Sequence, residues 1–139
     1  MKLDLKEWIA KITGQAEFKK LLWTNPSPTN TFNAQTLLNG VDLTVYDEIE
    51  VHGINYTTYG SIMPPIRIPI GGKGNLIGIA GSSGDSSGMG FLVARGVTVN
   101  NSSVTIQNAA GVATNGSSWS SNNNNMIPTK IFGIRYVGA

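Results

Sequence analysis

The sequence contains no cysteine among its 139 residues. This absence excludes a disulfide framework, a zinc site with cysteine ligands and a thiol nucleophile. The sequence also lacks an apolar run long enough to cross a membrane. The charged opening from Met1 to Ile12 has no apolar segment of the kind found in signal peptides. We therefore expect neither membrane insertion nor a secretory signal.

Charge is scarce as well. Only 13% of the residues are charged, and no acidic residue follows Asp85. Half of the basic residues lie before position 21, interleaved with Asp4, Glu7 and Glu17, and this mixture of signs is typical of a solvated helix face. The basic residues after position 85 are too sparse to follow a phosphate backbone. Nucleic acid is therefore not an expected partner.

The first fourteen residues carry the pattern of a short amphipathic helix. Its apolar residues recur at intervals of three and four and are Leu5, Trp8, Ile9 and Ile12. Asp4 and Glu7 are spaced as in a capping box, and Gly14 is a natural stop. A helix of about ten residues is marginal alone in water, so its apolar stripe needs a partner. Two partners fit: other copies of the helix in a short parallel coiled coil, or the domain that follows it.

From residue 15 onward, short apolar segments alternate with glycine, proline and asparagine. These segments predict roughly seven or eight strands. The clearest are Leu21–Trp23, Ala34–Leu38, Val45–Tyr56, Ile62–Ile70, Leu76–Ala80, Phe91–Val99, Val104–Gln107 and Ile127–Val137. Strands of this number and spacing favour a mainly β fold. We expect a jelly-roll-like antiparallel β-sandwich over residues 15–139, preceded by one short N-terminal α-helix over residues 1–14.

Several positions predict how the strands are arranged. Pro65 and Pro69 place their strand at an edge or beside a bulge, because proline has no N–H to donate. The apolar phase changes after Gly53, which predicts a bulge there, and Asn39-Gly40 is a hairpin-type dipeptide. The polar run from 111 to 125 is not expected to bury much. The final strand is expected to be a central one.

The motifs do not predict a catalytic site. Gly84–Gly88 looks like the nucleophile motif of trypsin-like proteases, but the only histidine, His52, lacks the setting of a general base, so a loop is the favoured interpretation. Glu48, Glu50 and His52 share one strand face and offer two carboxylates and an imidazole to a metal. Neighbours on one face lie ~7 Å apart, so a solvated outer face is the better interpretation. We predict no catalytic, cofactor-binding or metal-binding residue and no cofactor.

Aromatic residues in polar surroundings are the more useful signal. Trp119, Tyr56 and Tyr59 lie among serine, threonine and asparagine, and Asn122 and Asn123 follow Trp119 closely. Aromatic faces beside amides and hydroxyls suit sugar rings, through stacking and hydrogen bonds. We take these five residues as candidate ligand contacts. The alternative is that the aromatic side chains fold back into the core.

Both ends of the sequence resemble a known group of proteins. The similar segments are Leu3–Lys11, Lys20–Pro26, Phe32–Thr36, Tyr46–Val51 and Ile127–Arg135. They resemble small tail- or baseplate-associated, tail-fibre-like receptor-binding proteins of phages and prophages of gut Gram-positive bacteria. The resemblance implies a virion structural protein, commonly a homotrimer, that is assembled in the bacterial host cytoplasm. It supplies no catalytic residues.

Two functions follow as expectations. The first is a tail or baseplate protein, a homotrimer that contacts other virion tail proteins and binds host-surface glycan. Many weak sites on such a trimer gain avidity. The second is a monomeric bacterial carbohydrate-binding module of β-sandwich fold. An enzyme such as a depolymerase would need a carboxylate pair that the sequence does not supply within one chain.

Overall fold

The computed structural model describes residues 17–56, 63–81, 90–113, 120–121 and 123–137, together with the single residues 5, 8 and 14. Its nine strands are β1 (Glu17–Thr24), β2 (Gln35–Leu37), β3 (Glu48–Tyr56), β4 (Ile66–Pro69), β5 (Lys73–Gly81), β6 (Gly90–Asn100), β7 (Ser103–Ala113), β8 (Ser120–Ser121) and β9 (Asn125–Tyr136). The described residues are therefore mainly β, as predicted. Within them no helix is long and apolar enough to cross a membrane.

The expected N-terminal helix falls almost wholly outside the described residues, and Ile9 and Ile12 lie there too. Leu5 and Trp8 are described, and their side chains are exposed. No helical element appears among the elements of the described chain, so the helix stays a prediction.

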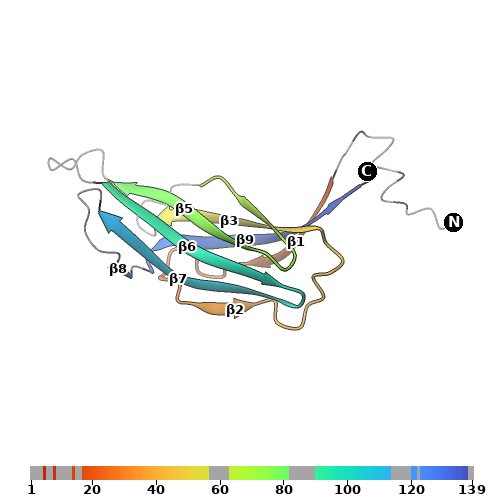
Figure 1. Ribbon diagram of the computed structural model, residues 1–139, viewed down its shortest axis with the longest axis horizontal. Coiled ribbons are helices and arrows are strands. Elements are labelled where there is room, and N and C mark those ends of the chain that lie inside the picture. Colours follow the sequence, from red (N-terminus) through yellow and green to blue (C-terminus); the bar gives the residue numbers. More distant parts are fainter. Residues whose placement is uncertain are drawn as a thin grey trace.

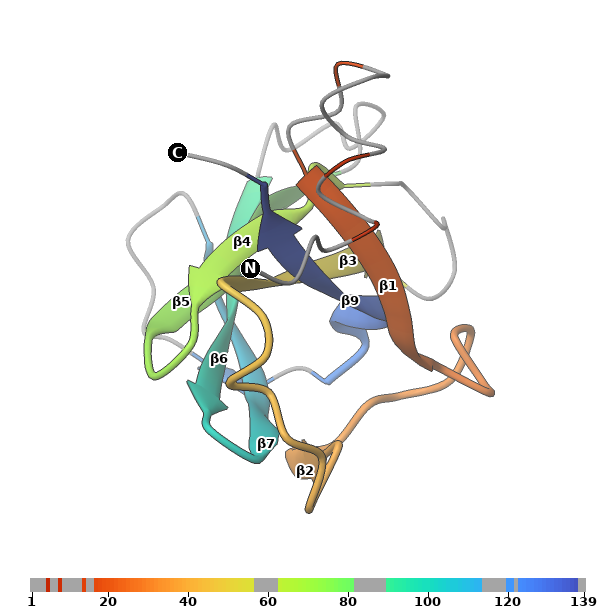
Figure 2. The ribbon, with the colours of Figure 1, turned by 90° about the vertical axis from the view of Figure 1, so that its right-hand side faces the viewer.

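The strands form two antiparallel sheets that pack face to face (Figures 1 and 2). Sheet A has the order β1-β9-β3-β4, and sheet B has the order β2-β7-β6-β5, with β8 added beside β7. The strands β5, β6 and β7 follow one another as a meander, whereas β1 pairs with β9 and β2 pairs with β7 across long stretches of sequence. The β-sandwich prediction is confirmed at this level.

The core lies between the two sheets and is almost entirely aliphatic. Its fully buried members include Leu43, Ile49, Val51, Leu76, Val97, Val99, Val104, Ile106, Met126, Ile127 and Ile131. In strands such as β6, these residues alternate with outward-facing ones, because successive side chains point to opposite faces of a sheet. Burial of these side chains is the main source of stability, at roughly 25 cal/mol per Å² of apolar surface removed from water.

Local chemistry explains several features that were predicted. The strand with the prolines, β4, is the edge strand of sheet A, and the final strand, β9, is central between β1 and β3. The β3–β9 register shifts between His52 and Gly53, where a bulge was expected, but the extra residue is Thr129 of β9 and not a residue of β3. Asn101 and Ser102 form the turn between β6 and β7.

The two sides of the sandwich are closed differently. On one side a short turn joins the edge strands β4 and β5, and Gly71 takes a φ of +85° there, which favours glycine. On the other side the edge strands β1 and β2 are joined by residues 25–34. Figure 2 shows this orange loop passing from the end of β1 to β2. The β1–β2 side of the sandwich is therefore spanned by a longer connection than the β4–β5 side.

Three expectations about local structure are wrong. The first strand begins at Glu17 instead of Leu21, because Lys19 and its neighbours continue the ladder with β9. Asn39-Gly40 does not close a hairpin, because β2 and β3 belong to different sheets. The polar run is not all solvated, since Asn125 is only 4% exposed. Each error arises where long-range strand pairing overrides a local signal.

Candidate functional site

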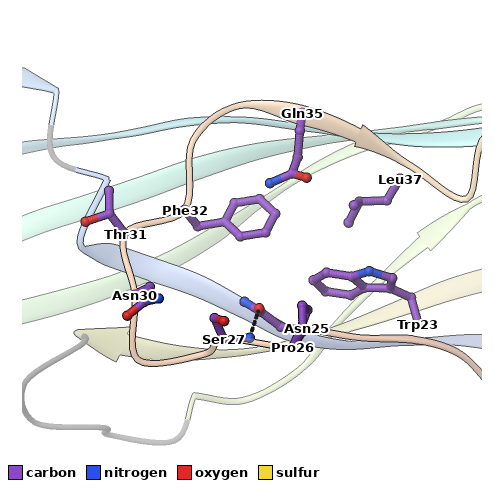
Figure 3. Close-up of a pocket in the computed structure, with 9 residues that line it drawn as sticks. All are labelled: Trp23, Asn25, Pro26, Ser27, Asn30, Thr31, Phe32, Gln35 and Leu37. Atoms are coloured by element: carbon purple, nitrogen blue, oxygen red, sulfur yellow. Dashed lines mark hydrogen bonds between the residues drawn. The ribbon is translucent and has the colours of Figure 1, made fainter.

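A groove of about 310 Å³ opens between the end of β1 and β2 (Figure 3). It is lined by Trp23, Asn25, Pro26, Ser27, Asn30, Thr31, Phe32, Gln35 and Leu37. The volume lies at the lower end of the range for small-molecule sites. None of the nine lining side chains carries a charge. The groove therefore presents apolar surface together with amides and hydroxyls.

A bulge in β1 turns Trp23 toward this groove. Leu21 pairs with Phe132 and Trp23 pairs with Ile131, so Leu22 is an extra residue in β1. Without the extra residue, Trp23 would share the outer face with Leu21, because side chains alternate along a strand. Instead Trp23 packs against the core cluster, while Leu21 is 49% exposed.

The apolar part of the groove is built from Trp23, Phe32 and Leu37. The Trp23 and Phe32 rings meet edge to face, with their centroids 6.1 Å apart and their planes at 77°, which is a favoured geometry for aromatic pairs. Phe32 and Leu37 are buried, whereas Trp23 is only half-buried. Figure 3 shows the three side chains converging, with Gln35 beside them. Of the two rings, Trp23 is thus the one a ligand can reach.

Asn25 fixes the loop that leaves β1. Its side chain is buried, its backbone N–H donates to the Thr129 carbonyl at 2.8 Å, and its Nδ2 donates to the Pro128 carbonyl at 2.9 Å. Its Oδ1 accepts a hydrogen bond from the Ser27 N–H at 2.8 Å, which forms an Asx-type turn. The bond to the Thr129 carbonyl continues the β1–β9 ladder, in which Thr24 pairs with Lys130. The start of the loop is therefore held by β9, the neighbouring strand of sheet A.

A buried arginine lies behind the groove. Arg95 is 0% exposed and shares the inward register of Val93 and Val97 on β6. Its Nη1 donates to the carbonyls of Phe32 at 2.8 Å and Gln107 at 2.7 Å. Its Nη2 donates to the carbonyls of Asn123 at 3.2 Å and Asn125 at 3.0 Å. These four acceptors come from the β1–β2 loop, β7, the turn before β9 and β9 itself.

Arg95 forms no ion pair with a described carboxylate. Its guanidinium carbon lies 5.4 Å from the centre of the Phe32 ring, so the aromatic face adds to the carbonyl dipoles. Burial lowers the pKa of Arg95 to about 10, and the group stays charged at neutral pH. A buried cation that is solvated mainly by carbonyls is costly to remove, because its acceptors are then left without donors.

An asparagine cluster fixes the other end of the loop. The Asn123 Nδ2 donates to Asn33 Oδ1 at 3.1 Å and to Asn108 Oδ1 at 2.9 Å. The Asn123 Oδ1 accepts from the Ala109 N–H at 2.9 Å, and Asn108 Oδ1 also accepts from the Ala34 N–H at 2.9 Å. Asn123 therefore holds the end of the loop in place, and its side-chain amide already has partners within the protein.

The bulge in β7 makes this cluster possible. Arg95 pairs with Ala109 and Val97 pairs with Ile106, so Gln107 and Asn108 stand opposite a single residue of β6. The bulge directs the Asn108 side chain to the loop and the Gln107 carbonyl to Arg95. Thr31 adds a hydrogen bond of 2.6 Å to Asn124 Oδ1.

A second polar cluster covers the outer face of sheet A. Glu50 receives hydrogen bonds from Lys19 Nζ at 2.6 Å and Arg67 Nε at 2.7 Å, and its Oε1 lies 2.6 Å from His52 Nε2. Arg67 also binds both carboxylate oxygens of Glu17, each at 2.6 Å. Burial by itself raises the pKa of Glu50, but the hydrogen bonds from Lys19, His52 and Arg67 outweigh it and lower the pKa to about 2.

This cluster corrects the expectation of a fully solvated outer face. The Glu50 side chain is only 2% exposed, and Ile134, which pairs with Glu48 and Lys19, is 0% exposed on the same outer face. The oxygens of Glu50 are already occupied by cationic and imidazole nitrogens. Among the described residues, no group of three or more His, Asp or Glu side chains is arranged to hold a metal.

None of the candidate contacts predicted from the sequence is among the nine lining residues of the groove. Asn123 holds the loop that carries several of those lining residues. Tyr56 is the last residue of β3, and its backbone pairs with Asn125. Tyr59, Trp119 and Asn122 lie outside the described residues.

The sequence patterns did not indicate that Trp23, Asn30 and Gln35 line a groove or that Arg95 lies behind it. A signal for Arg95 was present, since a charged residue in the inward register of a strand needs buried partners. Pro26 and Pro28 predicted a loop, but they did not indicate which residues of that loop line the groove.

No family model, no curated protein and no solved structure matches this chain.

Proposed function

We propose that this chain is a non-enzymatic glycan-binding β-sandwich and that the β1–β2 groove is its binding site. The observation that carries the proposal is the groove lining, which combines the reachable Trp23 ring with uncharged amides and hydroxyls. A sugar ring stacks on an aromatic face, and its hydroxyls exchange hydrogen bonds with amides. The absence of charge in the lining favours a neutral glycan.

Two side chains of the lining are placed to contact a ligand. Asn30 and Gln35 are exposed, and Gln35 makes only one long hydrogen bond, 3.4 Å to the Asn33 carbonyl. The backbone N–H of Asn30 donates to the Ser27 carbonyl, but its side-chain amide has no hydrogen-bond partner among the described residues. Asn25 and Thr31, in contrast, are held by the protein. Ligand hydrogen bonds should therefore come from Asn30 and Gln35.

We place this glycan-binding chain in the tail or baseplate of a phage, as a homotrimer. Support comes from the sequence resemblance at both ends. The pairing of β1 with β9 and of β2 with β7 also fits the jelly-roll-like arrangement expected from the strand pattern. The proposal that the chain is not an enzyme rests on the groove lining, because none of the nine lining residues is titratable in the physiological range. A monomeric carbohydrate-binding module is the second candidate, and the same groove favours it equally.

Calorimetric titration with neutral and acidic bacterial cell-wall oligosaccharides tests the glycan site. We expect saturable binding of a neutral oligosaccharide. Asn30→Ala and Gln35→Ala should each weaken it about fivefold, which corresponds to about 1 kcal/mol for one hydrogen bond. Asn39→Ala, an exposed amide outside the groove, is the matched control and should bind like the unmodified chain. Equal loss in all three variants, or no binding of any oligosaccharide, would refute the site.

A further inference from the structure

The groove beside β2 leaves two primary amides free to bind a ligand. The Gln35 Nε2 donates one long hydrogen bond of 3.4 Å to the Asn33 carbonyl, and no described residue binds its Oε1. The side-chain amide of Asn30 also has no partner among the described residues. A primary amide donates through its nitrogen and accepts through its oxygen. A ligand group that satisfies both atoms of such an amide needs a donor and an acceptor of its own.

The two amides lie in different surroundings (Figure 3). The apolar end of the groove is formed by Trp23, Phe32 and Leu37, and Gln35 stands beside it. Phe32 is 6% exposed and Leu37 is 9% exposed, so this end presents mostly buried carbon. Asn30 lies toward the other end of the groove, on the β1–β2 loop. Only the Gln35 end therefore combines an amide with apolar surface.

A sugar that carries only hydroxyl groups does not match the apolar end. Each hydroxyl turned toward Phe32 or Leu37 would leave water without finding a partner, because neither side chain donates or accepts a hydrogen bond. Burying an unpaired hydroxyl weakens binding. A methyl group in the same place instead strengthens binding when it leaves water. The apolar end therefore selects a sugar with an apolar substituent.

The amide beside the apolar end narrows the choice of substituent. A deoxyhexose brings a methyl group alone, and an O-acetyl sugar brings a methyl and a carbonyl but no donor. An acetamido group carries a methyl, a carbonyl and an N–H, so it fills the apolar end and satisfies both atoms of the Gln35 amide. It is also uncharged, as are the nine lining side chains. A free amino sugar would bring a cation and find no carboxylate in the lining.

We propose that the groove recognises an N-acetylhexosamine, with the acetamido methyl against Phe32 and Leu37 and the acetamido amide bonded to Gln35. The sugar ring then lies on Trp23, and its hydroxyl groups reach Asn30. This inference rests on the proposed glycan site and names the class of sugar that the site takes. Gln35 sets the preference for the acetamido group, whereas Asn30 contributes equally to the binding of any sugar.

Calorimetric titration with two trisaccharides of the same linkage tests the proposal. Chitotriose carries an acetamido group on each ring, and cellotriose carries a hydroxyl group in its place. We expect chitotriose to bind at least about tenfold more tightly, because it adds one buried methyl group and one hydrogen bond. An undetectable affinity for cellotriose is the same result. Methyl fucoside, which has a methyl group without an amide, should compete for the groove more weakly than the methyl glycoside of N-acetylglucosamine.

Two variants show which amide sets the preference. Gln35→Ala should reduce the ratio of the two trisaccharide affinities about fivefold, because it removes the partner of the acetamido group. Asn30→Ala should weaken the binding of both trisaccharides by a similar factor and leave the ratio unchanged. Circular dichroism melting of each variant verifies that it is folded.

The outcomes distinguish the acetamido preference from the glycan site itself. Equal binding of chitotriose and cellotriose would overturn the preference and leave the glycan site in place. Binding of another neutral oligosaccharide but not of chitotriose would do the same. Equal competition by methyl fucoside would show that the groove recognises a methyl group alone, and the proposal would be wrong. If no oligosaccharide binds, the proposed glycan site is refuted together with this inference.

Discussion

Arg95 holds both the backbone and the ring of Phe32. Its Nη1 donates to the Phe32 carbonyl at 2.8 Å, and its guanidinium carbon lies 5.4 Å from the centre of the Phe32 ring. Phe32 in turn meets Trp23 edge to face. One buried cation therefore positions the wall of the groove and joins it to the turn at Asn123 and to β7.

We predict that Arg95→Met destabilises the protein by about 3 kcal/mol. Methionine fills much of the same volume, but the carbonyls of Phe32, Gln107, Asn123 and Asn125 lose their donor, and those of Phe32 and Asn125 remain buried. Urea unfolding followed by tryptophan fluorescence measures the change. Lys73→Met, which removes an exposed cation, is the control and should change stability by less than about 0.5 kcal/mol. A stable Arg95→Met variant would mean that the carbonyls find other donors.

We predict that Glu50 makes stability depend on pH in the acid range. Its pKa falls from 4.5 to about 2 on folding, so the folded protein binds fewer protons at this site than the unfolded chain. The stabilisation is complete above pH 4.5 and is lost as the pH falls from 4.5 toward 2. The shift corresponds to about 3 kcal/mol. Urea unfolding measured at a series of pH values in this window tests the prediction.

The variant Glu50→Gln isolates this contribution. It keeps the shape of the side chain but cannot ionise, so its stability should change less with pH in that window than that of the unmodified chain. Above pH 4.5 it should be less stable, because Lys19 and Arg67 lose their acceptor charge. Parallel pH profiles for the two proteins would assign the acid sensitivity to other carboxylates.

We predict that Gly133→Ala destabilises the protein by about 1–3 kcal/mol through overpacking. A Cβ at this position of β9 would lie 2.5 Å from Cε1 of the Tyr46 ring, a separation that real Cβ atoms do not show. Thermal unfolding measures the loss. Tyr46→Ala removes the ring, so the double variant should lose less than the sum of the two single losses. If the losses of stability in the two single variants simply add in the double variant, the contact with Tyr46 is not the cause of the destabilisation by Gly133→Ala.

Much of the fold was predictable because it follows from short-range rules. The alternation of Ile66 and Ile68 with polar or proline neighbours predicts a strand, and proline's missing N–H puts that strand at an edge. The phase change at Gly53 predicts an irregularity at that position of β3, and the β3–β9 register does shift there, although the extra residue is on β9. These signals need only the geometry of one strand.

The candidate site was far less predictable because it depends on register between distant strands. Trp23 faces the groove only because Leu22 is an extra residue opposite β9. The hydrogen bonds that Asn123 makes within the protein depend on the bulge at Gln107 and Asn108, which no local pattern in the sequence predicted. No local pattern reveals which strand of a pair carries the extra residue.

The sequence by itself determined the strand periodicity, the low charge and the lack of any cysteine-based chemistry, since these are properties of composition and of neighbouring side chains. Only the tertiary structure decided that Arg95 lies buried behind the groove and that Ile77 and Leu92 share an exposed face. The reason is physical: which side of a residue is buried depends on pairing with strands far along the chain, and a shift of one residue exchanges the two faces.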